Sequence, residues 1–240
     1  MFLKLLQTEW FKLRKSKFSF ILIVGPLIGF FAGFTEDING PYKWNVTLLI
    51  MSLTYSLLFL PLVTGVLAGL ICRYEHQEGG WKQLLALPVS RGQVFVAKYT
   101  LLMILVLVIQ LLFLLALYAV GMIKGYSEPF PMLIVWKSIF GGWVATFPLV
   151  ALQLWMSMMW KSFAAPFAVN VIFTLPGILA IQSAKFGPYY PWGQPFLMMY
   201  VDEGKDSIFF VPWEQVMTVV GGSFLIFFLA GFVYLQRKAV

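Results

Sequence analysis

Six long apolar runs constrain the fold of this chain more than any other feature of its sequence. They are 17 to 29 residues long and cover residues 18–34, 46–71, 94–122, 132–160, 163–181 and 213–235. A helix needs about 20 consecutive apolar residues, with a range of about 17–25, to cross the hydrocarbon core of a bilayer. The runs therefore predict an all-α integral membrane protein with six transmembrane helices, the third and fourth long enough to tilt or to project beyond the bilayer. Gly141, Gly142 and Pro148 predict interruptions of the helix within the fourth run.

The composition agrees with this prediction. Of the 240 residues, 60% are hydrophobic and 11% are charged, whereas a soluble domain carries about 25% charged residues. The aromatic content of 18% fits belts of Trp and Tyr at the two membrane interfaces. Because the apolar runs take up most of the chain, we expect residues 1–240 to form a single transmembrane domain.

The distribution of charge predicts the orientation. With the N-terminus inside, the cytoplasmic segments hold 12 Lys and Arg against 3 Asp and Glu, and the outer segments hold 5 against 7. This excess of basic residues on one side is the positive-inside pattern, so we expect both termini in the cytoplasm. The net charge of +7 is spread over the ends of apolar runs, and we therefore do not expect binding to nucleic acid.

Residues 1–17, which precede the first run, are amphipathic. At about 100° per residue, apolar side chains share one face and polar ones the other. The apolar face holds Phe2, Leu3, Leu6, Trp10 and Leu13, and the opposite face holds Lys4, Thr8, Lys12 and Lys15. This pattern predicts a helix that lies in the membrane interface with its basic side toward anionic headgroups. The alternative is a simple basic flank at the start of the first span.

A polar island, residues 72–93, separates the second and third runs on the predicted cytoplasmic side. Trp81, Leu84 and Leu85 stand at i, i+3 and i+4, which predicts a short helix with one apolar ridge. The glycines at 79–80 and Pro88 limit this helix to about two turns.

Trp is a frequent anchor of protein interfaces. The short helix would therefore suit a groove on a partner, with a charged rim formed by Glu75, Glu78, Lys82 and Arg91. The alternative is an ordinary loop whose Trp lies in the headgroup layer.

Segment 74–99 resembles the loop between the second and third spans of permease subunits in the type 2 ABC exporter superfamily. In particular it resembles the small permeases of lantibiotic-immunity and bacitracin-resistance transporters. The residues that carry the resemblance are Glu75, Gly80, Trp81, Lys82, Leu84, Leu85, Pro88, Ser90, Arg91 and Lys98. A weaker match is segment 191–195, which is similar to a Pro-Trp-x-x-Pro element before the last span of those permeases.

The resemblance implies that the island is a coupling helix for a separate ATP-binding subunit and that residues 1–17 are an elbow helix. The implied ATPase contacts are Glu75, His76, Glu78, Gly80, Trp81, Lys82, Leu84, Leu85, Ser90 and Arg91. Two ATPase subunits, which bind ATP and magnesium, would drive a pathway formed by this chain and a second permease, identical or related. The implied function is export of lantibiotic-like or other membrane-active peptides across a bacterial plasma membrane, giving immunity or resistance.

Enzyme chemistry is not expected in this chain. The sequence has no GxxxxGK[ST] phosphate loop, no HExxH and no GxSxG motif. Its one histidine, His76, cannot build a metal site, because metals need several ligands. We therefore expect no catalytic residue, metal or cofactor here.

Possible substrate contacts come from two regions. Gln110, Gln153 and Asn170 are the deep polar residues of the spans besides Ser and Thr, and hydrogen bonding between helices is the commoner role for such residues. The outer segment 182–212 combines aromatic and acidic side chains that would suit a cationic amphipathic peptide, unless it is only an interfacial belt. Its candidates are Trp192, Tyr200, Asp202, Glu203 and Asp206.

Other functions stay open at this point. Mid-membrane ionisable residues, which proton relays and ion pumps need, are almost absent from the apolar runs. The same architecture could nevertheless export a lipid, a sodium ion or a small drug. A sensor or scaffold that moves nothing is a candidate from another class. A channel is disfavoured, because no apolar run carries a continuous polar stripe.

Overall fold

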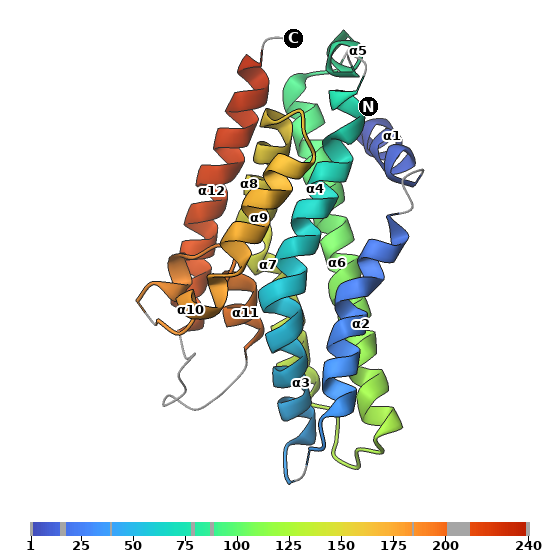
Figure 1. Ribbon diagram of the computed structural model, residues 1–240, viewed down its shortest axis with the longest axis vertical. Helices are drawn as coiled ribbons and strands as arrows, with labels where there is room; N and C mark the ends of the chain where they lie inside the picture. Colours follow the sequence, from blue (N-terminus) through green and yellow to red (C-terminus); the bar gives the residue numbers. More distant parts are fainter. Residues whose placement is uncertain are drawn as a thin grey trace.

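The computed structural model describes residues 2–14, 18–38, 40–77, 80–86, 89–183, 185–200 and 212–238, with only the backbone at residues 85 and 86. Within these ranges the secondary structure is helical and contains no strand. The long helices run side by side along the longest axis of the molecule (Figure 1). The predicted all-α architecture is confirmed for this part of the chain.

Four helical stretches are long and apolar enough to cross a membrane, and they match the second, third, fourth and sixth apolar runs. The second run contains a π-helical turn that the sequence analysis did not anticipate. The four stretches are Lys43–His76 (α3 Lys43–Thr54, η1 Tyr55–Phe59 and α4 Leu60–His76), α6 Arg91–Ile123, Met132–Met159 (α7 Met132–Ala145 and α8 Phe147–Met159) and α12 Trp213–Arg237.

The first and fifth runs form shorter helices. Helix α2 spans Ser19–Thr35, and α1 (Phe2–Arg14) lies at a steep angle to it (Figure 1). The fifth run is divided into α9 (Ala164–Thr174) and α10 (Gly177–Ala180), with Pro176 between them. The 17 residues of α2 rise about 25 Å, whereas the hydrocarbon core is about 30 Å thick. The count of six membrane-crossing helices therefore stays a prediction.

The helix of the fourth run is interrupted at one of the predicted places and not at the other. The break lies at Thr146, two residues before Pro148, which stands in the first turn of α8, where its missing N–H is tolerated. Helix α7 continues through Gly141 and Gly142, so the predicted interruption there is wrong. A Cβ atom at Gly142 would lie 2.4 Å from Cγ of Met199. This glycine instead admits helix α11 (Gln194–Met199), which packs against α7.

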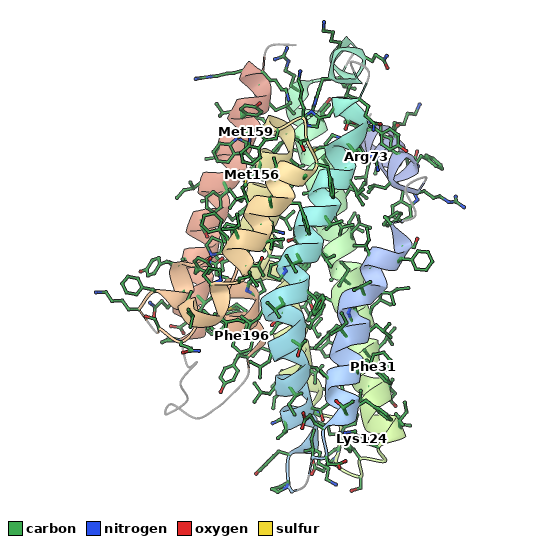
Figure 2. The ribbon with its side chains drawn as sticks, in the orientation of Figure 1. Phe31, Arg73, Lys124, Met156, Met159 and Phe196 are labelled. Atoms are coloured by element: carbon green, nitrogen blue, oxygen red, sulfur yellow. The ribbon has the colours of Figure 1, made fainter. Side chains whose placement is uncertain are left out.

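The two ends of the bundle differ in what they carry. Helix α1, the short helix α5 (Gly80–Ala86) and the C-terminal end of α12 lie at one end, called the α5 end below (Figure 1). The start of α3 and the connection from α6 to α7 lie at the opposite end, the α3 end. In Figure 2, Arg73 and Met159 lie toward the α5 end and Lys124 lies at the α3 end.

Candidate coupling site

Helix α5 is the short helix predicted on the polar island. It folds back on the end of α4, where the backbone N–H of Gly80 donates to the carbonyl oxygen of Gln77 at 2.9 Å. A Cβ atom at Gly80 would lie 2.5 Å from the carbonyl oxygen of Tyr74 and 2.9 Å from Cα of Glu75. Both neighbours are backbone atoms that cannot move aside, so the start of α5 requires glycine.

Trp81 fastens α5 to the rest of the chain. Its side chain is only 6% exposed, and the ammonium of Lys238 lies 4.3 Å from the ring centroid, a favourable cation–π distance. Lys238 also donates to the carbonyl oxygen of Met158 at 2.6 Å, and burial lowers the pKa of its ammonium group below the ordinary value. In this structure the end of α12 covers the ring of Trp81, so the ring is not presented at the surface, and its contact with a partner stays a prediction.

His76 links α5 to α8 through both ring nitrogens. Its Nδ1 accepts from the indole Nε1 of Trp81 at 3.3 Å, and its Nε2 lies 2.7 Å from the carbonyl oxygen of Ser157. Because a carbonyl oxygen can only accept, these two bonds assign the hydrogen of a neutral imidazole to Nε2. His76 is therefore a structural link between helices here, not an exposed contact.

The remaining predicted contacts differ in how far they are exposed to solvent. Lys82 and Ser90 are exposed, and Ser90 caps α6 by accepting from the backbone N–H of Gln93 at 3.2 Å. Arg91 is half-buried and donates to the carbonyl oxygens of the last residues of α12. Glu75 and Leu84 are buried. Glu78 and the side chain of Leu85 lie outside the described residues.

Four charged side chains meet beneath α5 and form the ionic cluster. They are Glu9 from α1, Lys12 from α1, Glu75 from α4 and Lys98 from α6. The Nζ atom of Lys98 lies 2.5 Å from Oε2 of Glu9 and 3.0 Å from Oε1 of Glu75. The Nζ atom of Lys12 lies 2.7 Å from Oε1 of each glutamate. Two positive and two negative groups thus balance across three helices.

The ionic cluster is almost entirely removed from solvent. The side chains of Glu9 and Lys98 are fully buried, that of Glu75 is 2% exposed, and only Lys12 reaches 26%. Lys98 also donates to the carbonyl oxygen of Ile71 at 2.9 Å. Charges are buried only when they are paired, since an isolated buried charge is strongly destabilising. The cluster therefore acts as a joint that holds α1 against α4 and α6.

The ionic cluster determines which side of α1 packs against the bundle. Leu5, Glu9 and Leu13 face the bundle, whereas Leu3 is 71% and Trp10 is 40% exposed. The side of α1 that faces the bundle therefore carries the polar Glu9, which pairs with Lys98, whereas Leu3 and Trp10 of the predicted membrane-facing side stay exposed. Of the other predicted interface residues, Phe2 and Leu6 are half-buried, Lys4 is exposed, Lys12 belongs to the cluster, and Lys15 lies outside the described residues.

Sequence reasoning did not find the cluster, although one signal was available. Glu9 is the only acidic residue in the first 17, and it stands beside the apolar stripe of an otherwise basic helix. An acidic side chain in that position needs a buried cation. Lys98 was noted only as part of the resemblance, and nothing in its local pattern distinguishes it from a basic residue at the end of a span.

The deep polar residues form hydrogen bonds between helices. Asn170 accepts at Oδ1 from Nε2 of Gln153 and from Nε1 of Trp192, both at 2.7 Å, and donates to the carbonyl oxygen of Pro61 at 2.8 Å. A Cβ atom at Gly65 would lie 2.1 Å from Nδ2 of Asn170, so this glycine makes room for the amide. The network joins α4, α8, α9 and the segment that precedes α11.

Gln110 is equally enclosed. Its Oε1 accepts from the hydroxyl of Tyr55 at 3.2 Å, and its Nε2 lies 3.6 Å from Sδ of Met199. Gln110, Gln153 and Asn170 are fully buried, and Trp192 is 6% exposed. The interhelical alternative therefore describes these residues, and none of them is open to a ligand in this structure. Asp202, Glu203 and Asp206 lie outside the described residues, and Tyr200 borders a cavity described below.

Comparison with known families accounts for this arrangement. Residues 5–177, from α1 through α9, match the family described as ABC-2 family transporter protein. The chain belongs to this family. The matched region contains α5 and all four residues of the ionic cluster. Searches of curated proteins and of solved structures returned no match.

Membership of the ABC-2 family assigns the chain a general role. It is a multi-pass membrane permease of an ABC transporter, and the partner of such a permease is an ABC ATPase. The family description names no substrate. Helix α5 exposes the polar side chains of Lys82 and Gln83, whereas Trp81 and Leu84 are buried.

Proposed function

We propose that this permease is one membrane half of an ATP-driven exporter and that its ATPase docks on α5. The observation that carries the proposal is the anchoring of α5 through Trp81, which ties a small exposed helix to the ends of α4, α8 and α12. A helix attached in this way transmits an applied force to several spans at once. A loosely attached loop would absorb it.

The proposed mechanism follows from these attachments. ATP and magnesium bind in the partner subunits and draw them together, which displaces α5. Trp81 passes the displacement to α4 and α12, and the ionic cluster passes it from α4 to α6 and α1. Packed helices respond to such forces by rigid-body or shear movements rather than by continuous deformation. The spans would thereby alternate between inward-facing and outward-facing or collapsed arrangements.

We further propose six spans, with the α5 end and both termini in the cytoplasm of a bacterium. The excess of Lys and Arg on that side supports this orientation. Helices α2 and α9–α10, although short, carry exposed apolar side chains such as Phe20, Phe31 and Leu179 that suit a lipid environment. Two ATPase subunits and a second permease, identical or related, would complete the transporter.

The proposed substrate is a lantibiotic-like or other cationic, membrane-active peptide, whose export gives immunity or resistance. The resemblance of segment 74–99 to permeases of that group supports this choice. A same-type exporter of a lipid, a sodium ion or a small drug is the second candidate, and a non-transporting sensor is the third.

Affinity purification from the host membrane, with mass-spectrometric stoichiometry, tests the docking proposal. We expect an ATPase subunit to be retained by the wild-type chain. Lys82→Glu on the exposed face of α5 is expected to weaken retention, whereas Lys185→Glu, the same charge change at an exposed site outside the α5 end, leaves it unchanged. Recovery of the wild-type chain without any ATPase would refute the coupling role and favour the sensor.

A further inference from the structure

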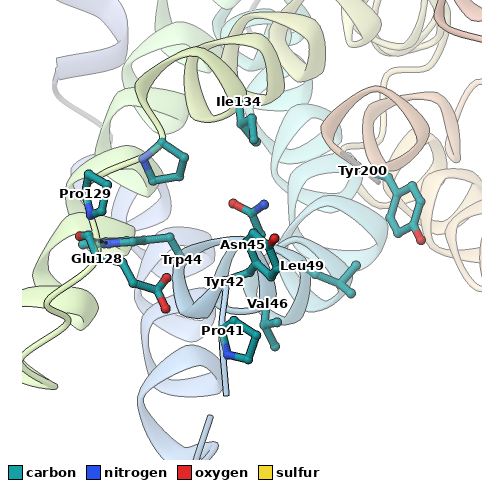
Figure 3. Close-up of a pocket in the computed structure, with 11 residues that line it drawn as sticks. Pro41, Tyr42, Trp44, Asn45, Val46, Leu49, Glu128, Pro129, Ile134 and Tyr200 are labelled. Carbon is teal, nitrogen blue, oxygen red and sulfur yellow. Dashed lines mark hydrogen bonds between the residues drawn. The ribbon is translucent and has the colours of Figure 1, made fainter. Parts of the chain in front are cut away.

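A large cavity opens at the α3 end of the permease. It has a volume of ≈ 900 Å³ and lies between the start of α3 and the connection from α6 to α7 (Figure 3). Ligand cavities in proteins usually measure about 300–1,000 Å³. The lining is mostly apolar, with prolines, aliphatic side chains and the rings of Tyr42, Trp44 and Tyr200. Its size and composition are therefore those of a small-ligand site.

Tyr42 has an unusual backbone at the edge of this cavity. Its φ of 64° and ψ of 37° are left-handed, and it is the only non-glycine residue with positive φ in the described part of the chain. Bulky side chains rarely adopt this conformation, which glycine adopts freely. The residue is 70% exposed, and its side chain forms no hydrogen bond or ring contact with another described residue.

The strain at Tyr42 therefore brings little packing benefit inside the chain. Strained residues concentrate at ligand sites, where the conformation is maintained because it positions a side chain for contact with something else. The conformation of Tyr42 thus points to a ligand independently of the volume of the cavity.

The lining also has a definite charge. Glu128 is its one charged side chain. Oε2 of Glu128 accepts from the backbone N–H of Lys43 at 3.0 Å, and its carbonyl oxygen accepts from Nε1 of Trp44 at 3.1 Å, so the carboxylate is held at the wall. The ammonium of Lys43 lies 5.9 Å from the ring centroid of Tyr126, which does not line the cavity. A carboxylate among aromatic rings favours an amine or a guanidinium group.

We propose that this cavity binds an apolar segment and the neighbouring basic group of a cationic amphipathic peptide. The proposal rests on the proposed export function and specifies where its substrate is held. Tyr42 and Val46, which are both exposed, contact the apolar part, and Glu128 pairs with the basic group. These residues all lie at the α3 end, away from the α5 end, so binding in the cavity and docking of the ATPase can be tested separately.

Fluorescence anisotropy of dansyl-labelled tetrapeptide amides with purified permease tests the site. The probes contain leucine together with lysine, with norleucine in place of lysine, or with glutamate in place of lysine. We expect the lysine probe to bind most tightly. Tyr42→Gly, which the left-handed backbone accommodates, is expected to weaken its binding by about tenfold, because the apolar part of the probe loses the ring that covers it.

Glu128→Gln isolates the charge, because the glutamine oxygen can still accept from the N–H of Lys43. We expect it to weaken binding of the lysine probe by about fivefold and to leave the norleucine probe unchanged. The matched control is Glu36→Gln, which removes an exposed carboxylate from the same end outside the cavity lining. It should have no effect on either probe.

Three results would overturn the proposal. The first is that Tyr42→Gly and Glu128→Gln both bind the lysine probe as tightly as the wild-type permease does. The second is equal affinity for all three probes with displacement by lysophosphatidylcholine, which would identify a lipid site. The third is loss of a dimer in Tyr42→Gly without a change in probe binding, which would identify a contact between copies. Retention of the ATPase, measured on the same variants, reports separately on the proposed function.

Discussion

The two ends of this permease are held together in different ways. At the α5 end, charged side chains from three helices are buried in mutual contact, as in the Lys98–Glu9 pair. At the α3 end, the start of α3 is held by ring contacts of Trp44 with Tyr126 and Phe130 and by the bonds of Glu128 to Lys43 and Trp44, and a cavity of ≈ 900 Å³ stays open beside them. Tight joints therefore occur where an external force is proposed to enter, and open space occurs at the opposite end.

This difference suggests how a helical bundle converts a force applied at one end into a movement at the other. We expect helices that are joined by buried ion pairs at one end to tilt about that end, because the cavity at the other end leaves room for movement. The largest displacement of their axes then arises far from the joint, at the α3 end. The comparison makes specific demands on both ends, and each of the following variants tests one of them.

Lys98→Met is expected to have the largest effect, because it leaves the two buried carboxylates of Glu9 and Glu75 with Lys12 as their one remaining cation in the cluster. Breaking a buried charge pair costs about 3–5 kcal/mol. The thermal midpoint of the purified permease, followed by loss of the monodisperse gel-filtration peak, measures this loss. Combining Lys98→Met with Glu9→Gln leaves one cation, Lys12, and one carboxylate, Glu75, and should restore most of the stability. A Lys98→Met protein as stable as wild type would show that the cluster is not a joint.

Trp81→Ala comes next. Removal of the indole ring frees α5 from His76 and Lys238, so the ATPase meets a helix that must be ordered on binding. We expect retention of the ATPase to weaken by about 2 kcal/mol, the cost of ordering a short segment on binding, with little change in membrane insertion. Titration of the ATPase against immobilised permease measures it. Trp81→Phe keeps an aromatic ring and should lose less. Wild-type affinity of Trp81→Ala would refute the anchoring role.

Tyr42→Gly should act in the opposite direction on stability. Glycine adopts the left-handed conformation of residue 42 without steric cost, so the free energy of unfolding should rise by about 1 kcal/mol. The same thermal assay measures the increase. A decrease in stability would mean that the ring packs in the fold and does not await a ligand. Tyr189→Gly, at another exposed tyrosine whose backbone is not left-handed, should destabilise slightly and serves as the control.

Arg91→Met should have the smallest effect. The Arg91 guanidinium donates to the carbonyl oxygens of Gln236 and Lys238, which would otherwise lack partners at the end of α12. A cation at a helix C-terminus contributes about 0.3–1 kcal/mol. We expect faster hydrogen exchange in the last turn of α12, without a change at the α3 end. Unchanged exchange in that turn would show that Arg91 does not hold the end of α12.

The sequence predicts the parts of this structure that depend on local pattern. The apolar runs locate the long helices, and the spacing of Trp81 and Leu84 between glycine and proline locates α5. The spacing of side chains along a helix and the missing N–H of proline act between residues that are close in sequence. Both can therefore be recognised without knowledge of the fold. The break before Pro148 is explained in the same way.

The sequence does not predict contacts between distant segments. The side of α1 that packs against the bundle depends on Lys98, 89 residues from Glu9. The burial of Trp81 depends on Lys238 at the end of the last helix. Gly141 and Gly142 were read as breaks, but their use depends on the approach of α11. The cavity at the α3 end arises where two connections fail to fill the space between them, which no local pattern encodes.

The pairing of Glu9 with Lys98 also sets an order of events during synthesis. Glu9 leaves the ribosome 89 residues ahead of its partner, an interval of about 5–20 s at ordinary rates of translation. Until the third apolar run is inserted, Glu9 can pair only with Lys12 of its own helix among the members of the cluster. The first helix therefore reaches its final position late, after helices that follow it in the chain. A nascent chain arrested before Lys98 should still expose α1 to proteases.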